Sequence, residues 1–329
     1  MHPIDQFRQE FQQHNPLNVP TFAQTTSFAT WLKESGLPLF VAAFEHETGA
    51  RLPASTDEKM IEQGYPKGIN EFKKKHQQDC YFTANARIFV NICTSIAEGV
   101  VKAHTDPRAE PFSTRHHSLL KKLVLDAQFL LAEWAAHRQS VPGMYGIGKN
   151  SLHDAFQITH ATEQLLFAGS PFFAFEDNAT DSGAALLRVA LETRLRFGFG
   201  LLGVQDNATN AVDPLNLSKV LDAVGKHEPN VQLAVPLQHI SRVYGWSNIY
   251  VHIGLKHYTW SPIFALRYLN SLLRGGPYPG GNSVHAGIRT NRATLQAIQA
   301  EAEVAYSLDP SREQLLKLDP EQCSLILTP

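Results

Sequence analysis

The chain has 329 residues, of which 43% are hydrophobic and 18% charged, and its formal net charge is −2. This composition excludes wholesale disorder, and the charge excludes a protein that coats nucleic acid by bulk electrostatics. No apolar run reaches the roughly 18 residues of a membrane span, and the polar start MHPIDQFRQE does not resemble a signal peptide. Because the three cysteines have no zinc spacing, the sequence predicts reduced thiols and a cytoplasmic protein.

The first 140 residues predict an N-terminal helical region. Residues 3–13 have an amphipathic pattern, and several short helices follow them. Two long helices are then expected, one over about residues 70–104, which contain no proline, and one over about 114–139. The Gly/Pro-containing segment VPGMYGIGKN at 141–150 breaks the pattern and predicts a domain boundary.

Residues 150–275 predict a second region, a helical bundle. Its central helix spans 181–203, DSGAALLRVALETRLRFGFGLLG, and is apolar on most of its surface. Such a helix belongs in the middle of a bundle. Around it the sequence predicts a loop over 204–216 and further helices, among them those over 151–167, 218–225 and 235–254.

The remainder of the chain, residues 276–329, predicts an irregular segment followed by short helices. Ser261-Pro262 opens a helix just before it, and GGPYPGGNSVHAGIR at 275–289 is rich in Gly and Pro. Residues 291–307 and 310–318 are expected to be helical, and no strand is expected anywhere. The predicted fold class is therefore all-α, a multi-helix bundle with one irregular segment near the C-terminus.

The central helix carries a ladder of alternating charge. Arg188, Glu192 and Arg196 repeat at i, i+4 and i+8 between its apolar surfaces. In a solvated ladder each ion pair contributes about 0.3–0.5 kcal/mol. In a buried ladder an unpaired charge would cost several kcal/mol, so the three side chains would form a polar site. The sequence leaves both alternatives open.

The helix at 235–254 carries a second set of polar residues. Asn248 and His252 share one face, where they can orient each other or bind the same small ligand, unless His252 is a satisfied core residue. Aromatic side chains close by can pack in the core or stack on a base. They include Trp246, Tyr250 and Trp260.

The helix ALLRVALETRLR, followed by a helix that ends in SNIYVH, resembles the HEPN superfamily of helical bundles over residues 150–275. The hallmark of that superfamily is an arginine, a polar residue, a short spacer and a histidine. Asn248 matches the polar residue and His252 the histidine, whereas Ser247 stands at the arginine position. The resemblance implies a metal-independent endoribonuclease of a bacterial conflict, stress or antiviral-defence system, often active as a homodimer.

RNA cleavage needs a group that moves protons and a fixed cation beside the phosphate. His252 fits proton transfer, Asn248 fits an orienting role, and Arg188 or Arg196 supplies the cation. Predicted substrate-binding residues are Glu192, Trp246, Tyr250 and Trp260. Neither a metal nor a cofactor is expected, because the chain lacks E-x-x-H, H-E-x-x-H and P-loop motifs. The alternative is a non-catalytic helical module that binds a protein partner, with the same polar residues in structural roles.

Overall fold

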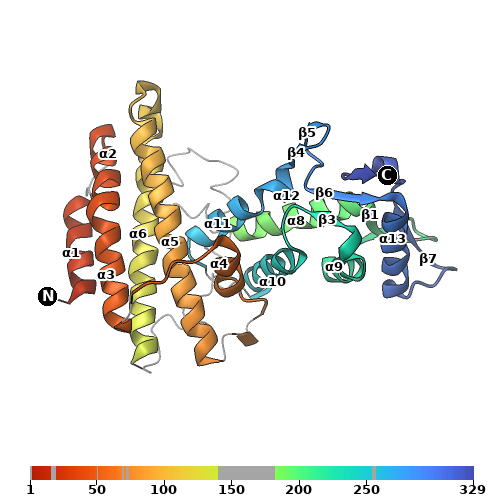
Figure 1. Ribbon diagram of the computed structural model, residues 1–329, viewed down its shortest axis with the longest axis horizontal. Coiled ribbons are helices and arrows are strands. Elements are labelled where there is room, and N and C mark those ends of the chain that lie inside the picture. Colours follow the sequence, from red (N-terminus) through yellow and green to blue (C-terminus); the bar gives the residue numbers. More distant parts are fainter. Residues whose placement is uncertain are drawn as a thin grey trace. The chain divides into compact units, whose positions relative to one another are not determined.

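The computed structural model describes residues 2–15, 20–49, 51–68, 70–71, 74–139, 182–253 and 257–329. These residues are mostly helical, with small sheets (Figure 1). None of their helices is long and apolar enough to cross a membrane. The expected break at 141–150 and the expected helix at 151–167 lie outside the described residues.

The chain divides into two compact units. Unit 1 consists of Met1–Ala184 and Asn248–Ala265, and unit 2 of Ala185–Ser247 and Leu266–Pro329. Each unit is therefore built from two separate stretches of sequence. The division falls inside three helices, α8 (Gly183–Phe199), α10 (Leu237–Ile253) and α11 (Trp260–Tyr268).

The described part of unit 1 is helical. Its helices are α1 (Pro3–His14), α2 (Phe22–Trp31), α3 (Leu37–Thr48), α4 (Asp57–Gly64), α5 (Lys75–Ala103) and α6 (Ser113–Arg138), with a π-helical turn at Leu32–Gly36 and a 3₁₀ helix at Pro107–Phe112. They pack pairwise, α1 on α3, α3 on α6, and α2 on both α5 and α6 (Figure 1). The two predicted long helices are confirmed as α5 and α6. Large aromatic residues fill the core, among them Phe7, Phe28, Phe40, Phe44, Phe89 and Trp134.

Local signals in the sequence set the ends of these helices. Thr21 and Gln24 form a capping box at the start of α2, and the Thr56 side chain caps α4. Gly49 ends α3 with φ at 65°, a left-handed conformation that glycine adopts without steric cost. The C-terminal turn of α3, which carries His46 and Glu47, lies beside His2 at the start of α1.

Unit 2 combines helices with small sheets. Its helices include α9 (Leu217–Lys226), α12 (Asn270–Arg274) and α13 (Arg292–Tyr306), together with the larger part of α8 and of α10. One antiparallel sheet has the order β2 (Val212–Pro214), β1 (Leu201–Asp206), β7 (Glu313–Lys317). A second has the order β3 (Gln232–Leu233), β6 (Ile288–Asn291), β8 (Ile326–Thr328), in which β6 and β8 are parallel.

The expectation that no strand exists is wrong, and the chain is mostly-α rather than all-α. Residues 310–318, expected to be a helix, contain β7, and the expected loop at 204–216 contains the end of β1 and all of β2. Five-residue segments such as EQLLK fit a helix or a strand, and here the pairing of β7 with β1 decides. The segment 275–289, expected to be irregular, holds a short hairpin of β4 (Gly276–Tyr278) and β5 (Gly281–Ser283).

The central helix ends at Phe199, four residues earlier than expected. Gly200 has φ at 62°, and a Cβ atom there would lie 2.6 Å from Cys323 Sγ. Only glycine combines this conformation with this close approach. The chain therefore leaves α8 at Gly200 and enters β1 directly.

Candidate functional sites

The Arg188–Glu192–Arg196 ladder lies on the part of α8 that belongs to unit 2. Arg188 Nε donates to Glu192 Oε1 and Arg196 Nη2 donates to Glu192 Oε2, each at 2.9 Å. The three side chains are 17–19% exposed, so the ladder is neither solvated nor sealed in a core. One carboxylate holds two guanidinium groups, and solvent reaches all three side chains.

Residues from other helices of unit 2 surround the ladder. The Tyr244 hydroxyl on α10 donates to Glu192 Oε1 at 3.3 Å, and the Arg188 guanidinium lies 5.7 Å from the Tyr244 ring centroid. Burial raises the pKa of Tyr306 on α13, and the charge of Arg196 opposes that shift, which places Arg196 within electrostatic reach of Tyr306. The Lys219 ammonium stands 4.2 Å from the centroid of the Tyr306 ring and adds a further cation.

Truncating the centre of this ladder tests its contribution to stability. A Glu192→Ala variant leaves two neighbouring guanidinium groups without their shared acceptor, so we expect a loss of about 2 kcal/mol in the free energy of unfolding. Urea denaturation of parent and variant measures it. Glu303→Ala is the control, because Glu303 pairs with Lys317 at an exposed site and should cost under about 1 kcal/mol. Equal losses in the two variants would show that the ladder behaves as an ordinary surface network.

The polar residues of α10 fall in different environments. Asn248 is half-buried and His252 is exposed in the last turn, and both belong to the stretch assigned to unit 1. Asn248 Oδ1 is buried without a hydrogen-bond partner among the described residues. Ser247, at the position of the motif arginine, is fully buried, and its hydroxyl donates to the Tyr244 carbonyl at 2.7 Å. The arginines of the ladder belong to unit 2.

The three aromatic candidates are buried. Trp260 is fully enclosed in unit 1, where its Nε1 donates to Asn85 Oδ1 at 3.1 Å and its ring stacks on Tyr258 with centroids 4.6 Å apart. Tyr250 packs against the His257 ring, with centroids 5.1 Å apart, and Trp246 is 7% exposed in unit 2. These contacts favour core packing, the other role that the sequence left open for them.

A buried carboxyl cluster in unit 1 escaped the sequence analysis. Glu133 Oε2 accepts a hydrogen bond from the Tyr258 hydroxyl, and Asp126 Oδ2 accepts the Thr259 N–H at 2.7 Å. Burial raises the pKa of Glu133 to about 7, the hydrogen bond from Tyr258 opposes the rise, and the charge of Asp126 adds to it. Glu133 therefore exchanges its proton near neutral pH.

A sequence signal for this cluster exists in α6. Asp126 and Glu133 stand seven residues apart, which puts them on one face of a helix. Leu123, Leu130 and Trp134, which lie close to this face, are all buried. Two carboxylates on an otherwise apolar helix face indicate a buried polar network.

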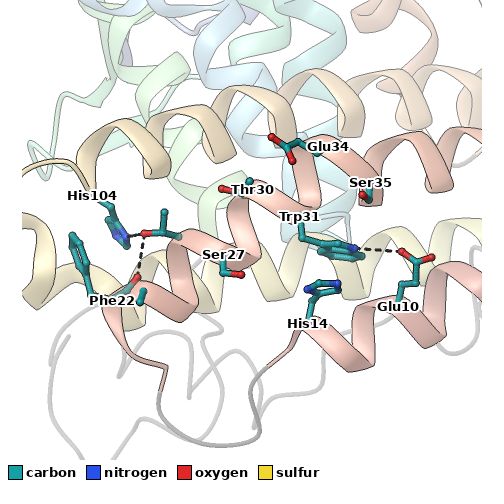
Figure 2. Close-up of a pocket in the computed structure, with 11 residues that line it drawn as sticks. Glu10, His14, Phe22, Ser27, Thr30, Trp31, Glu34, Ser35 and His104 are labelled. Atoms are coloured by element: carbon teal, nitrogen blue, oxygen red, sulfur yellow. Dashed lines mark hydrogen bonds between the residues drawn. The ribbon is translucent and has the colours of Figure 1, made fainter.

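Unit 1 also contains a cavity of about 700 Å³ between α1, α2 and the end of α5 (Figure 2). This volume is typical of small-molecule sites. Trp31 Nε1 donates to Glu10 Oε2 at 3.4 Å, while His104 Nδ1 lies 2.7 Å from Thr26 Oγ1. The residues that line the cavity include Glu10, His14, Phe22, Trp31, Glu34 and His104. Burial lowers the pKa of His104, so the imidazole in the wall is held neutral at physiological pH.

The chain gives no match to protein-family models, to curated proteins or to solved structures. The HEPN-like resemblance therefore rests on Asn248, His252 and the arginine ladder. The proposed function is therefore inferred from the chemistry of the described side chains.

Proposed function

We propose that this protein binds the phosphates of RNA or of a nucleotide through the Arg188–Glu192–Arg196 ladder. The observation that carries the proposal is the bridging carboxylate of Glu192, which holds the guanidinium groups of Arg188 and Arg196 on one side of α8. Guanidinium groups bind phosphate with two parallel hydrogen bonds, and holding them in place beforehand lowers the entropy lost on binding.

The surroundings of the ladder support the same ligand class. Lys219 and Tyr306 add a cation and an aromatic ring to the same unit. The side chains of Arg188 and Arg196 are 19% exposed, so a phosphate can reach them without unfolding of the helix. Because the net charge of the chain is −2, a phosphate ligand would be attracted by this local site and not by the protein as a whole.

Metal-independent cleavage of the bound RNA is the enzymatic form of this proposal. It assigns proton transfer to His252 and orientation to Asn248, as the HEPN-like resemblance implies. The exposure of His252 supports this role, since a general acid or base must reach its substrate.

Salt-dependent binding of a single-stranded RNA pool tests the phosphate contacts. We expect Arg196→Ala to weaken binding and to lower the slope of log affinity against log salt by about 0.7, the value for one phosphate contact on a single strand. Arg196→Lys should recover only part of the affinity, because an ammonium lacks the planar fork of arginine. Fluorescence anisotropy from 50 to 200 mM salt measures both quantities.

Arg292→Ala is the matched control, since Arg292 is also an ion-paired arginine of unit 2 but stands outside the ladder. It should leave affinity and slope unchanged. Thermal midpoints of all variants separate a binding defect from a folding defect. If the parent fails to bind RNA and mononucleotides, or if Arg196→Ala and Arg292→Ala behave alike, the phosphate-binding proposal fails.

The second candidate is a non-catalytic interaction module, and one observation favours it. Glu192 already pairs with Arg188, and the Tyr244 hydroxyl donates to Glu192. The charges of the ladder can therefore serve to fix the register of α8 against α10. On this alternative, Arg196→Ala changes the stability of the protein while the parent shows no affinity for RNA.

A further inference from the structure

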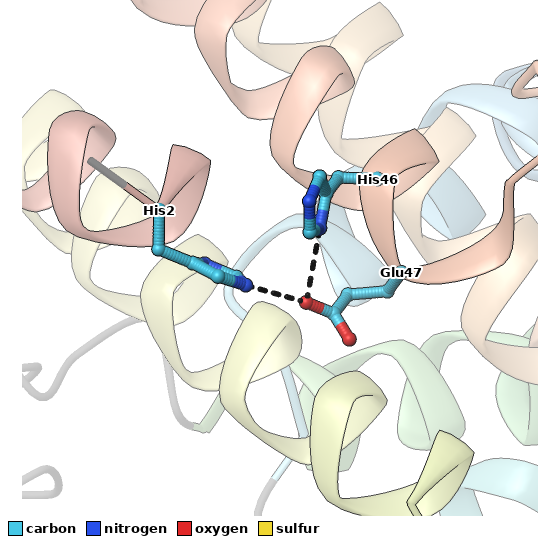
Figure 3. Close-up of side chains that lie close together, drawn as sticks. All are labelled: His2, His46 and Glu47. Carbon is cyan, nitrogen blue, oxygen red and sulfur yellow. Dashed lines mark ion pairs between the residues drawn. The ribbon is translucent and has the colours of Figure 1, made fainter.

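We propose that His2, His46 and Glu47 form a site for one divalent metal ion, with Zn²⁺ as the ion that fits best. All three residues belong to unit 1, and Figure 3 shows their side chains converging. Their potential donor atoms all lie within 4.8 Å of one another, and no other group of three such ligands meets this distance among the described residues. Two imidazoles and a carboxylate are a ligand set typical of zinc.

The distances between the donor atoms fit a tetrahedral ion. His2 Nε2 lies 3.2 Å from Glu47 Oε1, and His46 Nδ1 lies 3.6 Å from the same oxygen. With zinc–ligand bonds of about 2.1 Å, tetrahedral geometry places neighbouring donor atoms about 3.4 Å apart. Two of the three edges therefore already have the required length, and the rotamers of the exposed histidines can adjust the third.

The electrostatics of Glu47 also favour a cation. Its side chain is only 9% exposed, and its partners among the described residues are the two imidazoles. A buried carboxylate is costly unless a positive charge compensates it. His46 and Glu47 lie in the last turn of α3, where the helix dipole attracts a cation.

The first turn of α1 orients the third ligand. His2 Nδ1 accepts the Ile4 N–H at 3.4 Å, which directs His2 Nε2 toward Glu47. When a metal ion replaces the proton on Nε2, the neutral ring carries its proton on Nδ1. That exchange gives up only this one long hydrogen bond, so the start of α1 loses little.

The site would keep an open coordination position. The side chains of His2 and His46 are 41% and 54% exposed, so a water molecule or an external ligand can complete the tetrahedron. Because the three ligands come from both ends of the sequence that forms α1 to α3, a bound ion would fasten the start of α1 to the end of α3. Metal binding would therefore raise the thermal stability of unit 1.

Titration of the full chain with Zn²⁺ by calorimetry tests the proposal. We expect one high-affinity site in the parent and a loss of at least about 100-fold in that affinity for His46→Ala and for Glu47→Gln, since loss of a direct ligand exceeds the effect of losing an outer-shell partner. In a Co²⁺ titration, the parent should develop the visible absorption of a four-coordinate ion, and both variants should lack it.

His76→Ala is the matched control, because His76 is another exposed histidine of a unit 1 helix and lies outside the group of His2, His46 and Glu47. It should bind Zn²⁺ as the parent does. Circular dichroism without metal tests whether the variants are folded. We expect His46→Ala to fold, because the His46 side chain is exposed. A parent that binds no Zn²⁺, or His46→Ala and Glu47→Gln variants with the affinity of the parent, would overturn the site.

Discussion

A Glu133→Gln variant is expected to lack the fall in stability of about 3 kcal/mol that the parent undergoes at this carboxyl as the pH rises. Burial raises the pKa of Glu133 to about 7, against about 4.3 in an unfolded chain. The folded protein therefore retains a proton that the unfolded chain releases. The stability that this proton contributes is fully present below the unfolded pKa and is lost as the pH rises through 7.

Urea denaturation of parent and variant at pH 5 and pH 8 measures the effect. Glutamine keeps an oxygen that accepts the Tyr258 hydroxyl but has no proton to lose, so the variant should match the parent at pH 5 and exceed it at pH 8. Burial lowers the pKa of His104 and of His117, and those shifts reduce stability as the pH falls. The difference between the two proteins is therefore the relevant quantity.

Glu98→Gln is the control for this experiment, because Glu98 is half-exposed and pairs with Lys33 at the surface of unit 1. It should change stability little at either pH. A Glu133→Gln variant whose stability runs parallel to that of the parent at both pH values would contradict a proton held near neutrality on this carboxyl.

A His252→Ala variant is expected to cleave RNA about 10² to 10⁴ times more slowly than the parent, if the protein is the ribonuclease that its HEPN-like residues imply. A general acid or base contributes a factor of this size. The thermal midpoint should move little, because an exposed side chain at a helix end is not part of the core. Rates with a mixed RNA pool, with and without EDTA, measure the effect, and EDTA should not change them.

The control for cleavage is His227→Ala, which removes a histidine of unit 2 that has no assigned role in the proposed reaction. It should cleave at the rate of the parent. The parent must be assayed first, as a monomer and as any dimer it forms. Intact RNA after incubation with the parent would contradict the nuclease proposal. Phosphate binding by the ladder is tested separately, by the RNA-binding titration.

The long helices could be predicted because each one carries its own pattern. α5 and α6 have buried apolar residues every three or four positions. Gly49 marks the end of α3, because glycine readily adopts the left-handed conformation found there. The strands could not be predicted, since the pairing of Gln205 with Gln314 depends on contacts between distant parts of the chain. Short segments without a period take their structure from such partners.

The same distinction applies to the candidate sites. The spacing of Arg188, Glu192 and Arg196 predicted two ion pairs along one helix, and both pairs are present. The contact of Tyr244 with Glu192 could not be predicted, because Tyr244 belongs to another helix and the spacing within α8 does not indicate it. The proximity of His2 to His46 and Glu47 could not be predicted for the same reason, since it joins the start of α1 to the end of α3.

The division of α10 and α11 between the two units has a consequence for how the protein is made. The indole of Trp260 donates to Asn85, 175 positions earlier, and the Tyr65 hydroxyl donates to the Ser261 carbonyl, 196 positions away. During synthesis the N-terminal helices therefore emerge from the ribosome long before the residues that complete their core. Until residue 265 is released, the N-terminal helices lack these partners, so a chain truncated after the first 184 residues should aggregate more readily than the full chain.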